Sequence, residues 1–202
     1  DMGAVDDIGL LKMDMLGLRN LSVISECQIL IKEQLGQEIN INDIPLNDKR
    51  TFRLFQEGKT TSIFQLESEG MKRYLKELKP TDFNDISAMI SLYRPGPMNL
   101  IKSYIERKYG REEIKYLHPK LESILKNTYG IMIYQEQLMA SFQALAGLTL
   151  SQADVLRKAV GKKIKKLLDE QENVFKEGCA KVGTSKTIAN KFWALVEPFN
   201  RY

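Results

Sequence analysis

The sequence predicts a mainly α-helical fold preceded by one strand. Apolar residues recur at three- and four-residue spacings through most of the 202 residues, and glycines and prolines interrupt these runs at short intervals. Around Asp14, in contrast, apolar and charged residues alternate with the period of a strand. Because a strand without partner strands is not stable, we expect this first element to belong to a larger sheet.

The predicted strand lies in residues 9–20, which read GLLKMDMLGLRN. Alternation places Lys12 and Asp14 side by side on one face. The opposite, apolar face holds Leu11, Met13 and Met15. Two interpretations remain at this point: a half-buried strand whose charged face meets water, or the edge of an active site.

Helices are predicted after Arg19 from apolar spacing and capping residues. The first is expected to end before Gly36 and to bury one stripe of its surface. That stripe consists of Leu21, Ile24, Ile31 and Leu35. Asn47 is the predicted N-cap of the next helix, which Gly58 stops. Residues 61–68, TSIFQLES, read as a short β-like piece.

Further helices are predicted over residues 67–80 and 82–93, the first with one apolar face and a stop at Pro80. The apolar face comprises Met71, Leu75 and Leu78. The sequence RPGP at residues 94–97 then predicts a rigid turn, because two prolines with fixed φ flank a glycine.

Residues 129–134, YGIMIY, fit either a buried strand or the lead into a helix, and we favour a helix that begins after Tyr134. Ser151 and Asp154 resemble a capping box at the start of the following helix. Two more helices, over residues 167–183 and 186–197, complete the chain.

Composition excludes several classes of protein. The chain is 43% hydrophobic and 28% charged, as is ordinary for a globular protein, and no apolar run approaches the roughly 18 to 20 residues of a membrane span. We therefore expect a cytoplasmic protein without membrane contact. The single histidine, His118, argues against a histidine-dependent hydrolase. Cys27 and Cys179 form no CxxC pair, which argues against structural zinc and favours two small buried thiols.

The charge of the chain is concentrated in one segment. The net charge is +4, and residues 157–166, RKAVGKKIKK, carry six cations and no acid. Such a field attracts polyphosphate, although on the segment alone we favour a solvated helix face. Two classes of protein without catalytic activity also fit: a helical module that binds nucleic acid through its basic face, and a structural helical domain that docks partner proteins.

Several strings occur in a characteristic order: GLLKMDMLGLRNL, FQLESEGM, LYRPGPM, TYGIMIYQEQLM, LAGLTLSQADVLRKAVGKK and LVEPFNRY. Together they closely resemble the C family of bacterial replicative DNA polymerases, the family of the DNA polymerase III α subunit. The resemblance covers nearly the whole chain. It implies that residues 1–18 are the end of an incomplete α/β palm domain, and that residues 19–202 are a helical fingers domain that is incomplete at its C-terminal side.

The resemblance also implies roles for residues near the start of the chain. Asp14 matches one of three palm aspartates that bind two magnesium ions, and the other two belong to a PDIDxDF-like motif that this chain does not contain. Lys12 matches a lysine near the phosphates of the incoming nucleotide. Both are therefore candidate catalytic residues, and Asp14 is the candidate metal ligand. Magnesium prefers hard oxygen ligands, which suits an aspartate.

In the fingers, the family segment LRRAMGKK reads LRKAVGKK here. Arg157 is carried over directly, whereas Lys158 replaces an arginine and loses its planar fork. Lys162 and Lys163 complete the candidate sites for nucleotide phosphate. A mobile helix with such charges can close over a triphosphate.

The implied activity is the template-directed, magnesium-dependent addition of deoxynucleotides to a primer 3′ end. The implied partners are primer-template DNA, deoxynucleoside triphosphates, and a sliding clamp and other replisome subunits bound by the intact protein. With one of three metal-binding aspartates, the isolated chain is expected to be inactive. Tyr129 and Tyr134 fit base stacking or, as we favour, core packing. Residues 135–137 fit DNA contacts or an exposed helix start, and Arg94 is given no catalytic role.

Overall fold

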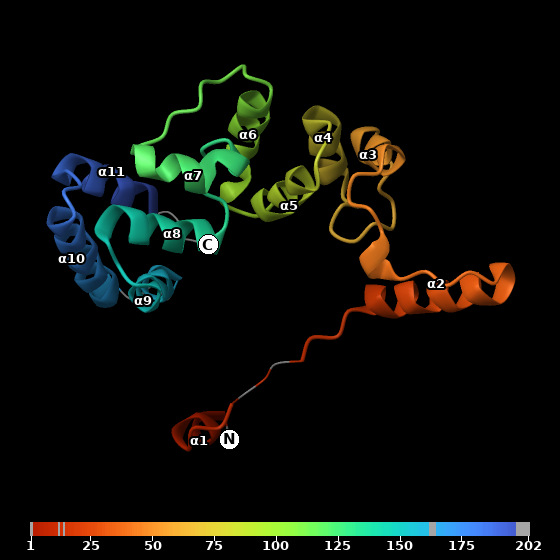
Figure 1. The fold of residues 1–202 in the computed structure, drawn as a ribbon, viewed down its shortest axis with the longest axis horizontal. Helices are drawn as coiled ribbons and strands as arrows, with labels where there is room; N and C mark the ends of the chain where they lie inside the picture. The colour runs from red at the N-terminus through yellow and green to blue at the C-terminus, as the bar shows by residue number, and fades with distance from the viewer. Residues whose placement is uncertain (1, 12, 14, 162–164, 197–202) are drawn as a thin grey trace. The chain divides into compact units, whose positions relative to one another are not determined.

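The computed structural model describes residues 2–11, 13, 15–161 and 165–196 (Figure 1). The chain divides into two compact units, Asp1–Pro45 and Leu46–Tyr202. Every regular element in the described residues is an α-helix or a short 3₁₀ helix, labelled η. The prediction of a mainly α fold is therefore confirmed.

The first unit contains α1 (Met2–Asp7), α2 (Arg19–Leu35) and η1 (Ile41–Asp43). Helix α2 ends as predicted at Gly36, whose φ of 65° is left-handed and whose N–H caps the Lys32 carbonyl. The predicted buried stripe is wrong for this unit, because no residue of α2 is buried in it. The chain returning along α2 makes polar contacts instead: Gln28 donates to the carbonyl of Ile39.

The predicted strand around Asp14 is absent from the described residues. Helix α1, which the sequence did not predict, is followed by a turn at Ile8 and Gly9 and by Leu10, Leu11, Met13 and 15–18 without regular structure. The physical reason is the one that makes any lone strand unstable: the described residues contain no second strand to complete its hydrogen bonds. Lys12 and Asp14 themselves lie outside the described residues.

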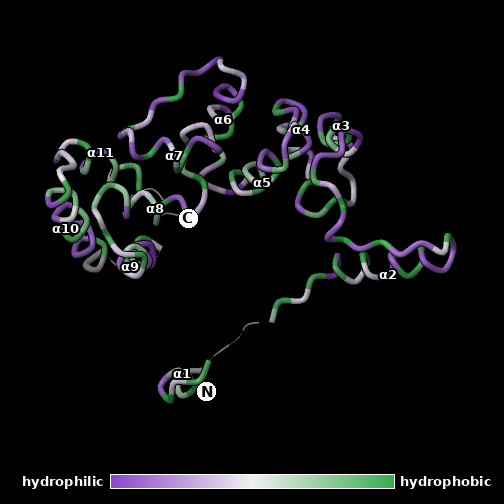
Figure 2. Tube along the Cα trace, viewed as in Figure 1, coloured by the Kyte–Doolittle hydropathy of each residue, from purple (hydrophilic) through white to green (hydrophobic). Residues whose placement is uncertain are grey.

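The second unit begins with four helices, α3 (Lys49–Gln56), α4 (Glu69–Leu78), α5 (Phe83–Leu92) and α6 (Ile101–Lys108). Hydrophobic and hydrophilic stretches alternate through these helices (Figure 2), as expected where each buries one face. Their buried side chains, together with Leu66 and Ile131 from the connecting segments, form what we call the first core cluster: Phe52, Leu66, Met71, Leu75, Leu78, Ile86, Ala88, Met89, Leu92, Ile101, Tyr104, Ile105 and Ile131. The predicted apolar face of α4 is confirmed by this burial.

Two local predictions in this region are wrong. The N-cap of α3 is Asp48, whose carboxylate accepts from the Thr51 N–H, and not its neighbour Asn47. Residues 61–68 form turns in place of a β-like piece, because Ser62 and Gln65 both have φ of 64°. A left-handed residue every third position prevents the continuous extended backbone of a strand.

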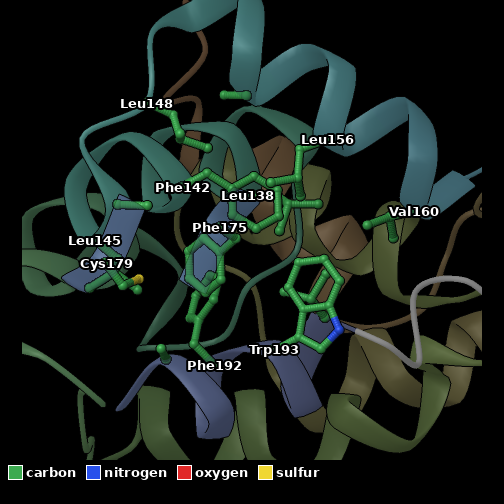
Figure 3. Packing of buried hydrophobic residues seen from close by; sticks show 14 of the residues in the cluster. Leu138, Phe142, Leu145, Leu148, Leu156, Val160, Phe175, Cys179, Phe192 and Trp193 are labelled. Carbon is green, nitrogen blue, oxygen red and sulfur yellow. The ribbon is translucent and has the colours of Figure 1, made fainter. Parts of the chain in front are cut away.

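A second core cluster is built from η3 (Pro119–Leu121), α7 (Glu122–Leu125), α8 (Gln135–Ala146), α9 (Leu150–Gly161), α10 (Lys165–Lys181) and α11 (Lys186–Val196). The short helix η4 (Lys126–Thr128) follows α7. Helix α8 packs against α7, α9 and α10, and α11 packs on α10 (Figure 1). Aromatic rings fill the centre (Figure 3): Phe142, Phe175, Phe192 and Trp193. The ring centroids of Phe142 and Phe175 lie 5.4 to 6.5 Å from each other and from those of Phe192 and Trp193.

The segment of residues 129–133 lies between the two clusters. Ile131 and Ile133 pack into or against the first cluster, whereas Met132 packs against the second. This alternation is typical of extended backbone with a core on either side. The segment therefore joins the two groups of helices within this unit.

The two cysteines differ in burial. Cys179 is buried as predicted, but Cys27 is exposed, so the prediction of two buried thiols is half right.

Among the helices described, none combines the length and apolar character needed to cross a bilayer.

Candidate functional site

A cavity of about 840 Å³ forms where three segments of the second unit meet. They are the turn after α5, the start of α8, and the C-terminal end of α9. Its lining includes Arg94, Pro95, Tyr134, Gln135, Glu136, Arg157 and Gly161. Three sequence runs that are far apart in the chain, RPGP, YGIMIYQEQ and LRKAVGKK, thus contribute to one site.

The turn at one side of the cavity is rigid, as the sequence predicted. Gly96 has φ of 112°, which a residue with a side chain rarely adopts, and Pro97 starts the 3₁₀ helix η2 (Pro97–Leu100). The Arg94 N–H donates to the Leu92 carbonyl at 2.8 Å. The base of the Arg94 side chain is therefore fixed relative to α5, while the side chain itself is exposed.

The start of α8 is organised by Gln137. Its Oε1 accepts hydrogen bonds from the N–H groups of Ile133 and Tyr134, at 2.9 and 3.0 Å, and its Nε2 donates to Thr128. The prediction of a helix after Tyr134 is confirmed. Gln135 and Glu136 are exposed, as expected for an exposed polar helix start. Gln137 is buried, so that interpretation is wrong for this residue.

Helix α9 starts with a capping box two residues earlier than predicted. The Thr149 N–H donates to Gln152 Oε1 at 2.9 Å, and the Gln152 N–H donates to Thr149 Oγ1 at 3.3 Å. The Ser151 and Asp154 pair predicted for this role is wrong. Asp154 is instead bound by the two cations that follow it on the same helix face.

Those cations are Arg157 and Lys158. Asp154 Oδ1 accepts from Arg157 Nε at 2.9 Å and from Nη2 at 2.8 Å, and Oδ2 lies 2.7 Å from Lys158 Nζ. Hydrogen bonds from Lys158 and then Arg157 hold the pKa of Asp154 below its ordinary value. Arg157 Nη1 also donates to Gln135 Oε1 at 3.2 Å, which links α9 to the start of α8.

Arg157 keeps the capacity to bind an anion. A guanidinium has five N–H donors, and the three bonds to Asp154 and Gln135 leave one free donor on each terminal nitrogen. Lys158 likewise has three donors, of which Asp154 takes one. The site can therefore present oriented cationic donors to a phosphate without first breaking its own ion pairs.

The structure describes two of the six site residues predicted from the sequence. Arg157 lines the cavity, whereas Lys158 is connected to Arg157 only through their shared partner Asp154. Lys12, Asp14, Lys162 and Lys163 lie outside the residues that the structure describes. Asp154 was missed as a partner of the cations, although its spacing of three and four residues from them on a helix is a signal. Arg94 carried no comparable local signal.

The two tyrosines considered for base stacking lie in different surroundings. Tyr129 packs edge to face on Tyr104, with ring centroids 5.1 Å apart, as core packing predicted. Tyr134 is half-buried at the cavity wall, and burial raises the pKa of its hydroxyl.

Among residues 2–11, 13, 15–161 and 165–196, no group of three or more His, Cys, Asp or Glu side chains could hold a metal. These residues alone do not fit a metal centre.

Comparison with known proteins identifies the family. Residues 20–183 match the family described as the bacterial DNA polymerase III alpha subunit finger domain. Over its full length the chain is 47% identical to DNA polymerase III subunit alpha of Aquifex aeolicus and of Halalkalibacterium halodurans, and 46% identical to that of Bacillus subtilis. It spans 18% of the length of each of these relatives. The chain therefore belongs to the bacterial DNA polymerase III alpha subunit family, and its match to that family includes the finger domain.

Proposed function

We propose that this chain is part of a replicative DNA polymerase and that the cavity bordered by Arg157 receives the triphosphate of the incoming deoxynucleotide. The observation that carries the proposal is the convergence of three family strings on one cavity with an oriented guanidinium. Nucleotidyl transfer places growing negative charge on phosphate oxygens, and fixed cationic donors stabilise that charge. In this proposal Arg157 and Lys158, followed in sequence by Lys162 and Lys163, supply such donors.

The proposed division of the chain follows the family resemblance. Residues 1–18 are assigned to the end of the palm, and residues 19–202 to the fingers. Asp14 is proposed as one magnesium ligand and Lys12 as a neighbour of the nucleotide phosphates. The partners proposed for the intact protein are primer-template DNA, deoxynucleoside triphosphates and replisome subunits that include a sliding clamp.

Primer extension by the intact protein tests the metal assignment. Asp14→Asn keeps the size of the side chain but removes its charge, so we expect extension to be abolished at every magnesium concentration. Asp7→Asn, on an exposed aspartate of α1, is the matched control and should leave extension unchanged. Near-normal turnover by Asp14→Asn would remove Asp14 from the metal site.

The assignment of the cavity is tested in the same assay. We expect Arg157→Ala to raise the apparent KM for deoxynucleotides by roughly 10- to 100-fold, because a hydrogen bond to a charged group contributes about 1.5 to 3 kcal/mol. Unchanged KM and kcat would contradict the proposal. A helical module that binds nucleic acid without catalysis would instead show DNA affinity that falls steeply with salt and is unaffected by Asp14→Asn.

The isolated 202-residue chain gives a separate test. Since it carries one of the three expected metal-binding aspartates, we expect no primer extension from the purified chain, with or without magnesium. Measurable magnesium-dependent extension would show that these residues contain a complete catalytic centre.

A further inference from the structure

Arg94 is a second guanidinium at the cavity that contains Arg157. The two arise from different parts of the unit: Arg94 follows α5, whose Leu92 lies in the first core cluster, and Arg157 belongs to α9, whose Leu156 lies in the second. Arg157 is held by Asp154 and Gln135, whereas the Arg94 guanidinium makes no hydrogen bond or ion pair with any described residue.

Arg94 makes the net charge of the described groups at the cavity positive. Among the described residues, the charged groups that line it, or that are connected to a lining residue through a chain of ion pairs, are Arg94, Glu136, Asp154, Arg157 and Lys158. Without Arg94, two cations face two carboxylates and the sum is zero. With Arg94 the sum is +1, so this residue makes the described site attractive to an anion.

The backbone holds Arg94 in place while its side chain can move. Its N–H donates to Leu92, its carbonyl accepts from the Met98 N–H at 3.3 Å, and prolines 95 and 97 fix φ on either side of Gly96. A cation on such a base can reach a ligand in the cavity without moving a helix. This arrangement differs from a surface arginine that merely braces a turn.

We propose that Arg94 binds a phosphate group of the same polyphosphate as Arg157, so that the ligand links the two core clusters. The proposal deepens the function proposed above and rests on it: the polyphosphate is the triphosphate of the incoming deoxynucleotide. Arginine suits this role because its planar fork can bind phosphate through two parallel hydrogen bonds.

Arg94→Gln in the intact polymerase tests this role. We expect its KM for deoxynucleotides to rise by roughly tenfold or more, and the inhibition constant of inorganic tripolyphosphate to rise by a similar factor. The Kd for primer-template DNA should stay unchanged. Arg73→Gln, which removes an exposed arginine of α4 outside the cavity, is the matched control and should alter none of these constants. Arg94→Lys should recover a large part of the KM, which a role in bracing the turn does not predict.

Two results would overturn the proposal in distinguishable ways. If Arg94→Gln weakens DNA binding and leaves the nucleotide KM unchanged, the phosphate that Arg94 binds belongs to DNA. If Arg94→Gln has no effect while Arg157→Ala raises KM, Arg94 is not part of the site although the proposed function stands. If neither substitution changes KM, the proposed function itself fails.

Discussion

Asp154 holds the Arg157 guanidinium along one edge, with Oδ1 accepting from Nε at 2.9 Å and from Nη2 at 2.8 Å. The same carboxylate binds Lys158 through its other oxygen. It therefore orients Arg157 and at the same time cancels part of the positive charge at the cavity. On the phosphate that we propose to bind in the cavity, these two effects act in opposite directions, so they can be separated by kinetics.

Asp154→Asn is expected to lower kcat without raising the KM for deoxynucleotides. The loss of a negative charge favours phosphate binding, but the weakened bonds to Asn leave Arg157 less well oriented for the transition state. We expect kcat to fall by roughly 3- to 10-fold in primer extension by the intact polymerase.

The matched control for Asp154→Asn is Glu172→Gln, which breaks an i,i+4 pair with Lys176 on α10. It should leave both constants unchanged. A raised KM with normal kcat in Asp154→Asn would show that the carboxylate does not orient Arg157.

Because Lys158 and Arg157 lower the pKa of Asp154, its ion pairs persist at neutral pH and are lost only as the pH falls through that lowered pKa.

A buried ion pair joins α5 to α6. Asp85 Oδ2 lies 2.5 Å from Lys108 Nζ, and the side chains are only 3% and 8% exposed. Asp85 also accepts from the N–H of Thr81 and from the Tyr104 hydroxyl, whose pKa is raised chiefly by burial. Lys108→Met leaves the carboxylate buried without its cation, so we expect the free energy of unfolding to fall by about 3 to 5 kcal/mol.

Urea unfolding of the 202-residue chain measures this loss as a lower midpoint with an unchanged m value. The matched control is Lys115→Met, because Lys115 pairs with Glu113 where both side chains are about three-quarters exposed, at 76% and 75%. An exposed pair contributes about 0 to 1 kcal/mol, so this variant should unfold near the wild-type midpoint. Equal losses in the two variants would contradict the importance of burial.

The two cysteines should differ sharply in reactivity. Burial raises the pKa of the Cys179 thiol to about 11, so at pH 8 about one thiol in a thousand is the reactive thiolate. Cys27 is exposed. Iodoacetamide at pH 8 should therefore modify Cys27 and leave Cys179 intact. Mass spectrometry of the Cys27→Ser chain is the direct test: it should gain no adduct when folded and one adduct in denaturant. Rapid modification of the folded Cys27→Ser chain would mean that α10 opens readily.

Much of the helical pattern is predictable from the sequence because its signals are local. Apolar spacing fixed the buried face of α4, and Gly36 and Gly58 mark helix ends through their left-handed φ. The errors in the helix caps occur where neighbouring residues offer the same signal. Asp48 caps α3 in place of Asn47, and Thr149 opens α9 in place of Ser151, because side chains of the same type compete within two residues.

The candidate site is harder to predict because it depends on contacts between distant segments. The cationic run indicated Arg157, but local sequence does not show that Gln135 binds it or that Arg94 borders the same cavity. The exposed stripe of α2 has a similar cause, since periodicity identifies an apolar face but not the surface that covers it. Long-range packing, not helix propensity, determines these features.

Helices α8 and α10 approach closely at Gly178. A Cβ atom added there would lie 2.6 Å from the carbonyl oxygen of Ala146 and 3.0 Å from its Cβ. Backbone atoms in a packed helix cannot move aside cheaply, and overpacking of this kind costs about 1 to 3 kcal/mol. Alanine also gains up to about 1 kcal/mol of helix propensity over glycine. We therefore expect Gly178→Ala to lower the free energy of unfolding by about 1 to 2 kcal/mol.

Thermal unfolding of the 202-residue chain should register this change as a Tm about 2 to 8 °C below that of the wild type. Gly161→Ala is the matched control in a helix, because a Cβ there meets nothing within 4 Å. Because Gly161 is the last residue of α9, this variant gains at most the same helix propensity, and without the clash its Tm should be close to or above the wild-type value. If Gly178→Ala were as stable as Gly161→Ala, α8 and α10 could separate to admit a methyl group. The close contact would then not contribute to holding the aromatic cluster together.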